Sequence, residues 1–331
     1  MIPIVLACDE HYIAPTYVAI LSLLLNKKEE TQYSFTILCP GGLAESSKEI
    51  IQQLAEQYGV PLRIVSMGKL FSEARMKIEH ITVPTLYRLY LPQVLEEEKC
   101  IYLDSDIIVN GDLTELYEIS LENNYIGGVL SEGIHLDRIY ARELCKRIGL
   151  QDVSTYVNAG VLLMNLDAIR NARLMDNWMK LVSMEFPAQD QDILNLTCYG
   201  KIKVIGLKYN AMTKTKSLVD YKKGYRNDVY DINEVNEAIK NPVIIHYADR
   251  IKPWDDREVF WAEYWWNIVG KITDSQAKRY IENFICQNNG YRKKTGERII
   301  KKKLIRLSQV LGIYGYLKRI EDYIKNKEVR K

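Results

Sequence analysis

Short runs of β-branched and other apolar residues alternate with amphipathic helical patterns through the first two thirds of the chain. The helical periodicity is clearest at residues 44–58 and 136–148. This alternation is typical of an α/β protein with a mostly parallel sheet covered by helices. The strands that it predicts span residues 2–8, 34–39, 62–65, 100–103, 125–129, 160–165 and 242–245.

Polar side chains follow three of the predicted strands. Asp9 comes after the first strand, Asp104 and Asp106 after the fourth, and His246 after the last. Ligands bind α/β sheets at the carboxyl ends of strands, so we expect these groups to meet at one edge of the sheet. Residues 200–230 are rich in Lys, Tyr, Gly and Asn with little periodicity, which predicts long loops over that edge.

The composition is that of an ordinary globular protein of 331 residues, 47% hydrophobic and 27% charged, long enough for one large domain and an appendage. The chain begins apolar, without a basic leader, and runs straight into Asp9, so its start predicts a strand and not a signal peptide. No apolar run approaches the roughly 18 residues of a membrane span. We therefore expect a cytoplasmic protein.

The six cysteines are scattered and form no Cys-x-x-Cys spacing. This distribution favours reduced, buried thiols over disulfides or a zinc site. The positions are Cys8, Cys39, Cys100, Cys145, Cys198 and Cys286.

Asp104, Ser105 and Asp106 form an Asp-x-Asp triplet within the apolar run 101–109. Unpaired carboxylates are costly to bury. In extended chain, residues i and i+2 point to the same side, so both carboxylates can hold one divalent cation that bridges a diphosphate. The triplet alone is a weak signal, because it recurs at 190–192 and a solvated turn is the alternative. The apolar flanks favour metal binding at the first copy.

His246 could complete this metal site. A lone histidine at a strand end is more often a hydrogen-bonded structural residue, but with two carboxylates it makes an O,O,N set suited to manganese. Lys252 follows six residues later and could neutralise a leaving diphosphate, with a surface lysine beside proline as the alternative.

Six motifs in order along residues 3–254 resemble glycosyltransferase family eight, a family of retaining enzymes. The motifs are Ala7-Cys-Asp9, Tyr87-Arg88-Leu89, Tyr102-Leu-Asp104-Ser-Asp106, Asn158-Ala159-Gly160-Val-Leu-Leu-Met-Asn165, Asp190-Gln191-Asp192-Ile-Leu-Asn195, and His246 through Lys252-Pro-Trp254. Each motif alone is unspecific, but their order is highly specific. The resemblance implies a single nucleotide-sugar-binding domain of the glycosyltransferase-A type, with a mostly parallel mixed sheet.

The resemblance also implies roles for individual residues. Manganese, with Mg²⁺ as the alternative, would be held by Asp104, Asp106 and His246, and Lys252 would grip the diphosphate. Asp9 would bind the uracil and ribose end of a UDP-sugar, and Arg88 would approach the sugar and phosphates. The further donor-binding positions are Ala7, His11, Ser105, Asn158 and Ala159, with Asp190 and Gln191 beside the hexose. His80 matches a position that faces the acceptor, with a surface histidine as the alternative.

Gln191 and Asp190 decide the expected mechanism. Double displacement needs a carboxylate under the anomeric carbon, and the matching position is Gln191, an amide and a poor nucleophile. We therefore favour front-face substitution, in which the departing UDP oxygen accepts the acceptor's proton. Asp190 is the fallback nucleophile, and an ordinary helix start is the structural alternative for this segment.

Three positions depart from the galactosyltransferase pattern. Ser131, followed by Glu132, stands where those enzymes often have an aspartate on the donor hexose, so galactose is not assured. His11 stands in place of an asparagine. Asp249 replaces a glycine, and its carboxylate would repel diphosphate unless it turned away.

Residues 290–331 are strongly basic. They hold 14 Lys and Arg against 4 Asp and Glu, a net charge of +10 that leaves −8 for the rest of a chain whose total is +2. Apolar residues at near-helical spacing predict a basic amphipathic helix within 298–324 that could lie on an anionic membrane surface. The alternative is that it packs on the catalytic domain or on a second subunit, giving a homo-oligomer. The tail lacks a nucleic-acid module, so we expect no nucleic-acid partner.

The leading functional hypothesis is a Mn²⁺-dependent, retaining hexosyltransferase that moves glucose or galactose from a UDP-sugar to a cell-surface glycan or glycolipid. We expect a catalytic domain at 1–270 and a helical C-terminal extension at 271–331. One alternative is a nucleotide-sugar-binding protein with weakened catalysis. Another is a glycogenin-like primer that glucosylates one of its own 23 tyrosines.

Overall fold

The computed structural model describes residues 1–72, 82–218 and 229–288. The chain divides into two compact units, residues 1–278 and 279–331. In the second unit the described residues, 279–288, are helical. Within the described ranges, every helix is too short or too polar to cross a lipid bilayer.

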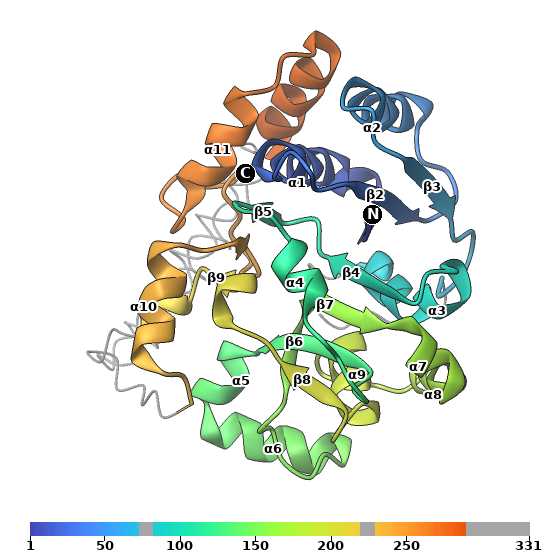
Figure 1. Cartoon of the computed structure of the whole chain (residues 1–331), viewed down its shortest axis with the longest axis vertical. Helices are drawn as coiled ribbons and strands as arrows, with labels where there is room; N and C mark the ends of the chain where they lie inside the picture. Colours follow the sequence, from blue (N-terminus) through green and yellow to red (C-terminus); the bar gives the residue numbers. More distant parts are fainter. Residues whose placement is uncertain (73–81, 219–228, 289–331) are drawn as a thin grey trace, which may run out of the picture. The chain divides into compact units, whose positions relative to one another are not determined.

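A seven-stranded sheet forms the centre of the first unit (Figure 1). Its strand order is β3-β2-β1-β4-β7-β6-β8, and β7 runs antiparallel to both of its neighbours while the remaining pairs are parallel. The predicted α/β class with a mostly parallel mixed sheet is therefore confirmed. The strands are β1 (Ile2–Ala7), β2 (Tyr33–Cys39), β3 (Leu62–Ser66), β4 (Lys99–Leu103), β6 (Ile126–Leu130), β7 (Val157–Asn165) and β8 (Ile202–Val204).

A second sheet has the order β5-β10-β9, with β5 at Ile107–Val109, β9 at Ala211–Met212 and β10 at Ile244–His246. Strand β10 pairs antiparallel with β5 and parallel with β9. The expectation of extended chain through 101–109 is therefore wrong, because β4 and β5 hydrogen-bond into different sheets and a turn joins them. The predicted long loops at 200–230 also contain β8, β9 and two short 3-10 helices, η3 (Leu207–Tyr209) and η4 (Thr215–Leu218).

The helical patterns in the sequence correspond to helices of the structure. Helix α2 fills the first predicted stretch, whereas α5 and α6 divide the second at Asp137. The Asp137 side chain accepts the Tyr140 amide and so caps the start of α6. The helices are α1 (Ile13–Asn26), α2 (Glu45–Gln57), α3 (Leu91–Val94), α4 (Thr114–Glu118), α5 (Glu132–Leu136), α6 (Arg138–Ile148), α7 (Leu166–Asn171), α8 (Leu174–Leu181), α9 (Asp190–Thr197), α10 (Ile232–Lys240) and α11 (Ala262–Gly270), with η1 (Glu10–Tyr12) and η2 (Val83–Tyr90).

The large sheet is buried on both faces. Along β4, Cys100 and Tyr102 belong to one apolar cluster with residues of η2, α6, α8 and α9, while the alternating Ile101 and Leu103 are equally buried on the other side. Helix α1 packs against α2, β5 and α11, as Figure 1 shows for the blue and orange elements. Burial on both faces fixes the strand ends, and with them the side chains at the carboxyl edge.

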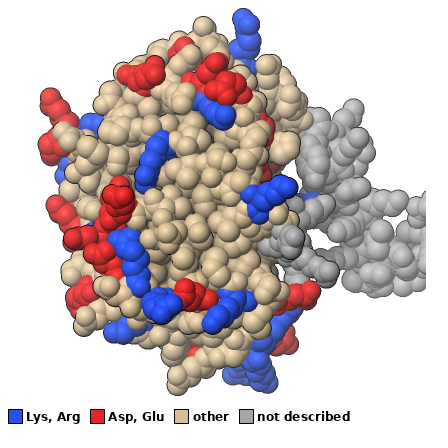
Figure 2. Space-filling view, turned by 90° about the vertical axis from the view of Figure 1, so that its right-hand side faces the viewer, with Lys and Arg blue, Asp and Glu red and all other residues tan. Residues whose placement is uncertain are grey.

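The surface of the described residues is mixed in charge on the side shown in Figure 2. This side carries β3, α3, α7 and α8, and its acidic and basic side chains lie around a broad uncharged area. The mixed charge contrasts with the basic composition of residues 290–331, which lie outside the described residues.

Candidate functional site

A cleft lies at the carboxyl ends of β1, β4 and β10. Most of the predicted site residues line it. His11, by contrast, is exposed and does not line it, and His80 lies outside the described residues. The predicted residues that line the cleft are Ala7, Asp9, Arg88, Asp104, Ser105, Asp106, Asn158, Ala159, Asp190, Gln191, His246 and Lys252.

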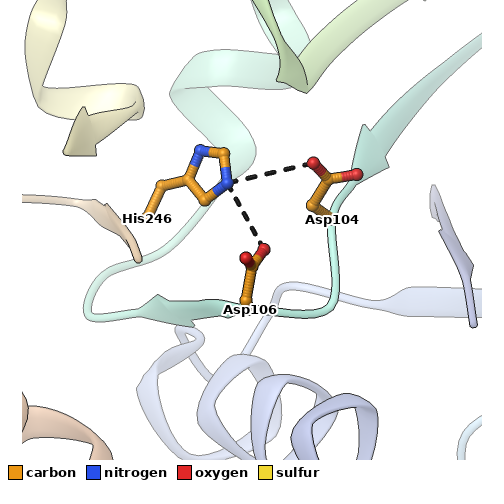
Figure 3. A group of neighbouring side chains, drawn as sticks. All are labelled: Asp104, Asp106 and His246. Carbon is orange, nitrogen blue, oxygen red and sulfur yellow. Dashed lines mark ion pairs between the residues drawn. The ribbon is translucent and has the colours of Figure 1, made fainter. Parts of the chain in front are cut away.

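Asp104 and Asp106 lie in the turn between β4 and β5 (Figure 3). The Asp104 amide donates to the Gly160 carbonyl at 2.7 Å, and the Asp106 carbonyl accepts the Tyr247 amide at 2.9 Å. Each backbone is thus bound to a different neighbouring segment. The two carboxylates converge because the turn carries them toward each other, and not because a strand alternates its side chains.

His246 ends β10, and its position follows from strand register. Because β10 runs antiparallel to β5, His246 pairs with Ile107, the residue directly after Asp106. The His246 Nε2 atom lies 3.3 Å from Asp106 Oδ1 and 3.9 Å from Asp104 Oδ2. One ligand atom from each of the three residues lies within 4.8 Å of the other two. Figure 3 shows all three side chains directed toward a common point.

These residues fit a divalent cation. Ligand atoms at about 2.1 Å from an octahedral ion lie about 3 Å apart. The His246–Asp106 separation of 3.3 Å is close to this value, and the His246–Asp104 separation of 3.9 Å is wider. Two carboxylates and one neutral imidazole are a donor set that takes hard to borderline divalent metals. The cleft holds four carboxylates, because Asp9 and Asp190 line it as well, against the two cations Arg88 and Lys252, so its fixed charge favours a cation.

Lys252 is not the surface lysine that its neighbour Pro253 suggested. Its side chain is 7% exposed, and Nζ donates to Asp106 Oδ2 at 2.5 Å and to the Tyr247 carbonyl at 2.6 Å. Burial alone would raise the pKa of Asp106, but the charges of Lys252 and His246 outweigh it and hold that pKa well below its usual range. Asp106 therefore stays ionised at any pH near neutrality.

Arg88 joins Asp104 to α9. Its guanidinium lies 2.8 Å from Asp104 Oδ1 through Nη2 and 3.0 Å from Asp190 Oδ2 through Nε, and it stacks on the Tyr102 ring at 4.4 Å. Burial raises the pKa of Asp190 to about 6 although Arg88 lowers it, and the negative charge of nearby Asp104 adds to the rise. Asp190 is thus a weakly acidic carboxyl bound to an arginine.

Gln191 faces the start of β7. Its Oε1 accepts the Asn158 side-chain amide at 3.2 Å and the Ala159 backbone amide at 3.1 Å. Gln189, which precedes α9, has a φ of 50° and a ψ of −115°, a strained conformation for a residue with a side chain. Strain of this kind is found where the surrounding structure holds a segment in place. Here the conformation of Gln189 places Asp190 and Gln191 in the cleft.

Hydrogen bonds near the end of β1 hold the neighbouring elements together. Ser105 Oγ donates to the Ala7 carbonyl at 3.2 Å and accepts from Thr16 at 2.8 Å, so its hydroxyl ties β1 and α1 to the turn. Asp9 accepts the His11 backbone amide at 3.1 Å and caps η1.

The second Asp-x-Asp triplet has a different structure. Asp190 and Asp192 begin α9, where residues two apart point in different directions. Asp192 accepts the Tyr156 hydroxyl at 2.5 Å and the Ala188 amide at 2.6 Å, whereas Asp190 pairs with Arg88. The two carboxylates therefore do not share a ligand position.

The structure also places Ser131, Glu132 and Asp249, where the sequence departs from the family pattern. Ser131 precedes α5, and the buried Glu132 hydrogen-bonds the Thr215 hydroxyl, with burial raising the pKa of Glu132 to about 8. Asp249 accepts Thr213 at 2.7 Å and pairs with Lys214 at 2.6 Å. The Asp249 carboxylate thus turns away to a lysine, which removes the repulsion expected from it.

Several residues of the site had no signal in the sequence that singled them out. Tyr12, Thr82 and Thr85 line the cleft, and the fully buried Asn210 hydrogen-bonds His246 Nδ1 at 2.9 Å. Threonines and tyrosines are too common to stand out. Asn210, directly before the two-residue strand β9, could have drawn attention only once β9 was known to pair with β10.

A mixed α/β sheet with two carboxylates, an imidazole and a buried lysine at its carboxyl edge is typical of a glycosyltransferase. The chain belongs to glycosyl transferase family 8, whose sequence profile matches residues 3–258. The resemblance stated from the six motifs is therefore confirmed, and the protein is a glycosyltransferase.

Known relatives and structures are similar over most of this chain. General stress protein A of Bacillus subtilis is 24% identical over 82% of this chain and 97% of its own length. A lipopolysaccharide 1,2-glucosyltransferase of Escherichia coli is 29% identical over 77% of this chain and 73% of its own. The galactosyltransferase LgtC, solved with donor and acceptor sugar analogs, is 26% identical with a TM-score of 0.68, over 82% of this chain and 97% of its own. The predicted glycosyltransferase-A-type fold is thereby confirmed.

Proposed function

We propose that this glycosyltransferase moves a hexose, glucose or galactose, from a UDP-sugar to a glycan or glycolipid acceptor, with retention and with Mn²⁺. The observation that carries the proposal is the convergence of Asp104, Asp106 and His246 in a cleft that also holds Lys252. The relatives named as lipopolysaccharide glucosyl- and galactosyltransferases support a hexose as the transferred group.

The metal would be held by Asp104, Asp106 and His246. Bound there, Mn²⁺ would supply positive charge to the diphosphate of the leaving group. Mg²⁺ is the alternative, but an imidazole ligand favours Mn²⁺ because Mg²⁺ prefers oxygen ligands and retained water.

Lys252 is proposed to hold the diphosphate from the protein side. Its ammonium group already lies against Asp106, so a phosphate oxygen beside the cation comes within its reach. A buried ammonium stabilises charge that grows on a leaving oxygen far better than an exposed one. Lys252 thus favours departure of UDP.

The residues beside the hexose favour front-face substitution over a covalent intermediate. Gln191 presents an amide, and its Oε1 already accepts two N–H groups. Asp190 pairs with Arg88, which reduces the availability of its oxygen lone pairs for attack. The departing UDP oxygen would therefore take the acceptor's proton on the same face, with Asp190 kept as the fallback nucleophile.

The remaining donor contacts are proposed from cleft positions. Asp9 would bind the uracil and ribose end, with Ala7, Ser105 and η1 shaping that end of the cleft. Asn158 and Ala159 would line the hexose with Gln191, while Arg88 fixes the orientation of Asp104 and Asp190. His80 is proposed to face the acceptor, and His11 to contact the nucleotide from the cleft's rim.

A panel of UDP-sugars tests the donor and the metal together. We expect UDP release from UDP-glucose or UDP-galactose that needs Mn²⁺ and is stronger with Mn²⁺ than with Mg²⁺. Asp106→Asn should lower this turnover at least 10²-fold, since it removes a ligand and the partner of Lys252. Asp192→Asn, from the other triplet, is the matched control and should retain Mn²⁺ dependence. Equal turnover in the Asp106 variant and the wild type would disprove the metal role.

The chain outside the cleft is proposed to direct the enzyme to its acceptor. We propose that residues 1–270 form the catalytic domain and that 271–331 form a C-terminal extension. Its basic segment would bind the anionic inner face of the cell membrane, with packing on a second subunit as the alternative. Sedimentation with phosphatidylglycerol vesicles tests this, because replacing Lys301, Lys302 and Lys303 by glutamate should abolish binding at low salt. Unchanged binding, or concentration-dependent dimerisation without binding, would favour the alternative.

A further inference from the structure

Asn210 connects the metal-binding end of the cleft to its hexose end without lining the cleft. It is fully buried directly before β9, the strand whose Met212 pairs with His246. Its Oδ1 lies 2.9 Å from His246 Nδ1, and its Nδ2 lies 2.9 Å from Asn158 Oδ1. Asn158 extends this series of hydrogen bonds, because its Nδ2 donates to Gln191 Oε1.

Two backbone amides set the direction of every hydrogen bond in this chain. The Gly160 N–H donates to Asn158 Oδ1 at 3.0 Å, so that atom is an acceptor. The Asn210 atom facing it is then the amide nitrogen, and the Asn210 oxygen faces His246. At the other end the Ala159 N–H donates to Gln191 Oε1, so this atom is the amide oxygen and the Asn158 atom that faces it is the amide nitrogen.

The direction of the chain determines the tautomer of His246. An amide oxygen can only accept, so His246 Nδ1 must carry the proton that it donates to Asn210. The lone pair of the neutral imidazole is then on Nε2, the atom that lies 3.3 Å from Asp106 Oδ1. A histidine binds a cation through such a lone pair, and a hydrogen bond from its other nitrogen orients the ring.

We propose that Asn210 is a positioning residue that holds His246 with Nδ1 protonated and Nε2 directed at the cation. Through Asn158 it also links the position of this ligand to the Gln191 amide beside the hexose. The inference rests on the proposed metal site for its functional meaning. The tautomer and the ring orientation, however, belong to the protein itself.

The first test is the nitrogen NMR spectrum of the metal-free protein. The chain has four histidines, so a His246→Gln variant identifies the His246 signals. We expect Nδ1 to carry a proton in the wild type, whether or not Nε2 also carries one toward Asp106, and we expect Nδ1 to be partly unprotonated in Asn210→Ala. An unprotonated Nδ1 in the wild type, or an unchanged spectrum in the variant, would overturn the inference.

The second test measures Mn²⁺ affinity by calorimetric titration without nucleotide. We expect Asn210→Ala to bind Mn²⁺ 10–100-fold more weakly, the usual effect of losing such a hydrogen-bond partner. We also expect Asn210→Ala to raise the KM for the donor, because it loses the hydrogen bond to Asn158. Asn210→Asp keeps an acceptor for Nδ1–H but cannot donate to Asn158, so it should recover most of the metal affinity and still show the raised KM. Equal Mn²⁺ affinity in Asn210→Ala and the wild type would refute the role.

Asn165→Ala is the matched control. Asn165 ends β7 at the opposite edge of the sheet, where its side chain caps α7, so its loss lowers stability without touching the cleft. If the wild type binds no Mn²⁺ but shows the expected tautomer, the proposed metal function fails while Asn210 still positions His246. If Asn210→Ala does not fold, the wild-type spectrum and Asn210→Asp decide the question.

Discussion

Replacing Gly160 by alanine would displace two of the proposed metal ligands, His246 and Asp104. A Cβ atom at this position would lie 2.2 Å from His246 Cε1 and 2.8 Å from Asp104 Oδ2. Carbon atoms in van der Waals contact are about 3.5–4.0 Å apart, so the His246 ring must move by about 1.5 Å. The Gly160 backbone is not in the left-handed region, so lack of space is the obstacle to a side chain.

The expected loss follows from that displacement. A shift of about 1 Å in a group that positions a reaction can cost 10²-fold, and a perturbed metal ligand costs 10–100-fold in affinity. Overpacking adds about 1–3 kcal/mol of lost stability. For Gly160→Ala we therefore expect Mn²⁺ binding at least 10-fold weaker and donor hydrolysis about 10²-fold slower.

Calorimetric Mn²⁺ titration, initial rates of UDP release and urea unfolding measure the three effects separately. Gly127→Ala is the control, because its Cβ would meet Leu121 Cδ2 at 3.0 Å, in the same sheet but away from the cleft. It should lose stability and keep Mn²⁺ affinity. If Gly160→Ala bound Mn²⁺ as tightly as the wild type, the close approach of β7 to His246 could not be what shapes the site.

Three further predictions concern buried charge. Burial raises the pKa of Glu132 from 4.5 to about 8, so between these pH values the folded protein keeps a proton that the unfolded chain releases. The free energy of unfolding should therefore fall as pH rises from 5 to 8. Urea unfolding of Glu132→Gln should show a much flatter pH dependence. Lys252→Met should slow donor turnover about 10²-fold without weakening Mn²⁺ binding, because Asp106 keeps its oxygens for the metal; an equal loss of Mn²⁺ affinity would contradict this. Arg88→Met should cost about 3–5 kcal/mol of unfolding free energy above pH 7 and less at pH 5, where Asp190 is protonated, and unfolding curves with the same loss at both pH values would speak against it.

The sheet could be predicted from the sequence because its signal is local. Strands β1 and β4 are short apolar runs, and α2 has one clear apolar face, so the type of each element can be recognised from its own residues. The turn at Asp104 to Asp106 could not be predicted in this way. The apolar residues on its two sides look like one strand, and only their pairing with distant β7 and β10 divides them between two sheets.

Long-range contacts also place two residues whose positions their local sequence does not determine. Lys252 has the local surroundings of a surface lysine, and its burial depends on Asp106, which is 146 positions away. Asn210 acquires its place only because β9 pairs with β10. Neither separation is visible in composition or periodicity, so the sequence could indicate Asp104, Asp106 and His246 as a group but not the residues that orient them.

The two Asp-x-Asp triplets show why a motif needs its secondary structure. In an α-helix, residues two apart are turned by about 200° around the axis, so Asp190 and Asp192 face different partners, Arg88 and Tyr156. In the turn after β4, Asp104 and Asp106 converge on His246. If an Asp-x-Asp triplet binds Mn²⁺ only in the turn and not in the helix, Asp192→Asn must leave Mn²⁺ affinity intact. The variant should still lose about 1–3 kcal/mol of stability, because its contact with Tyr156 is lost. A loss of Mn²⁺ affinity in that variant would show that α9 belongs to the metal site after all.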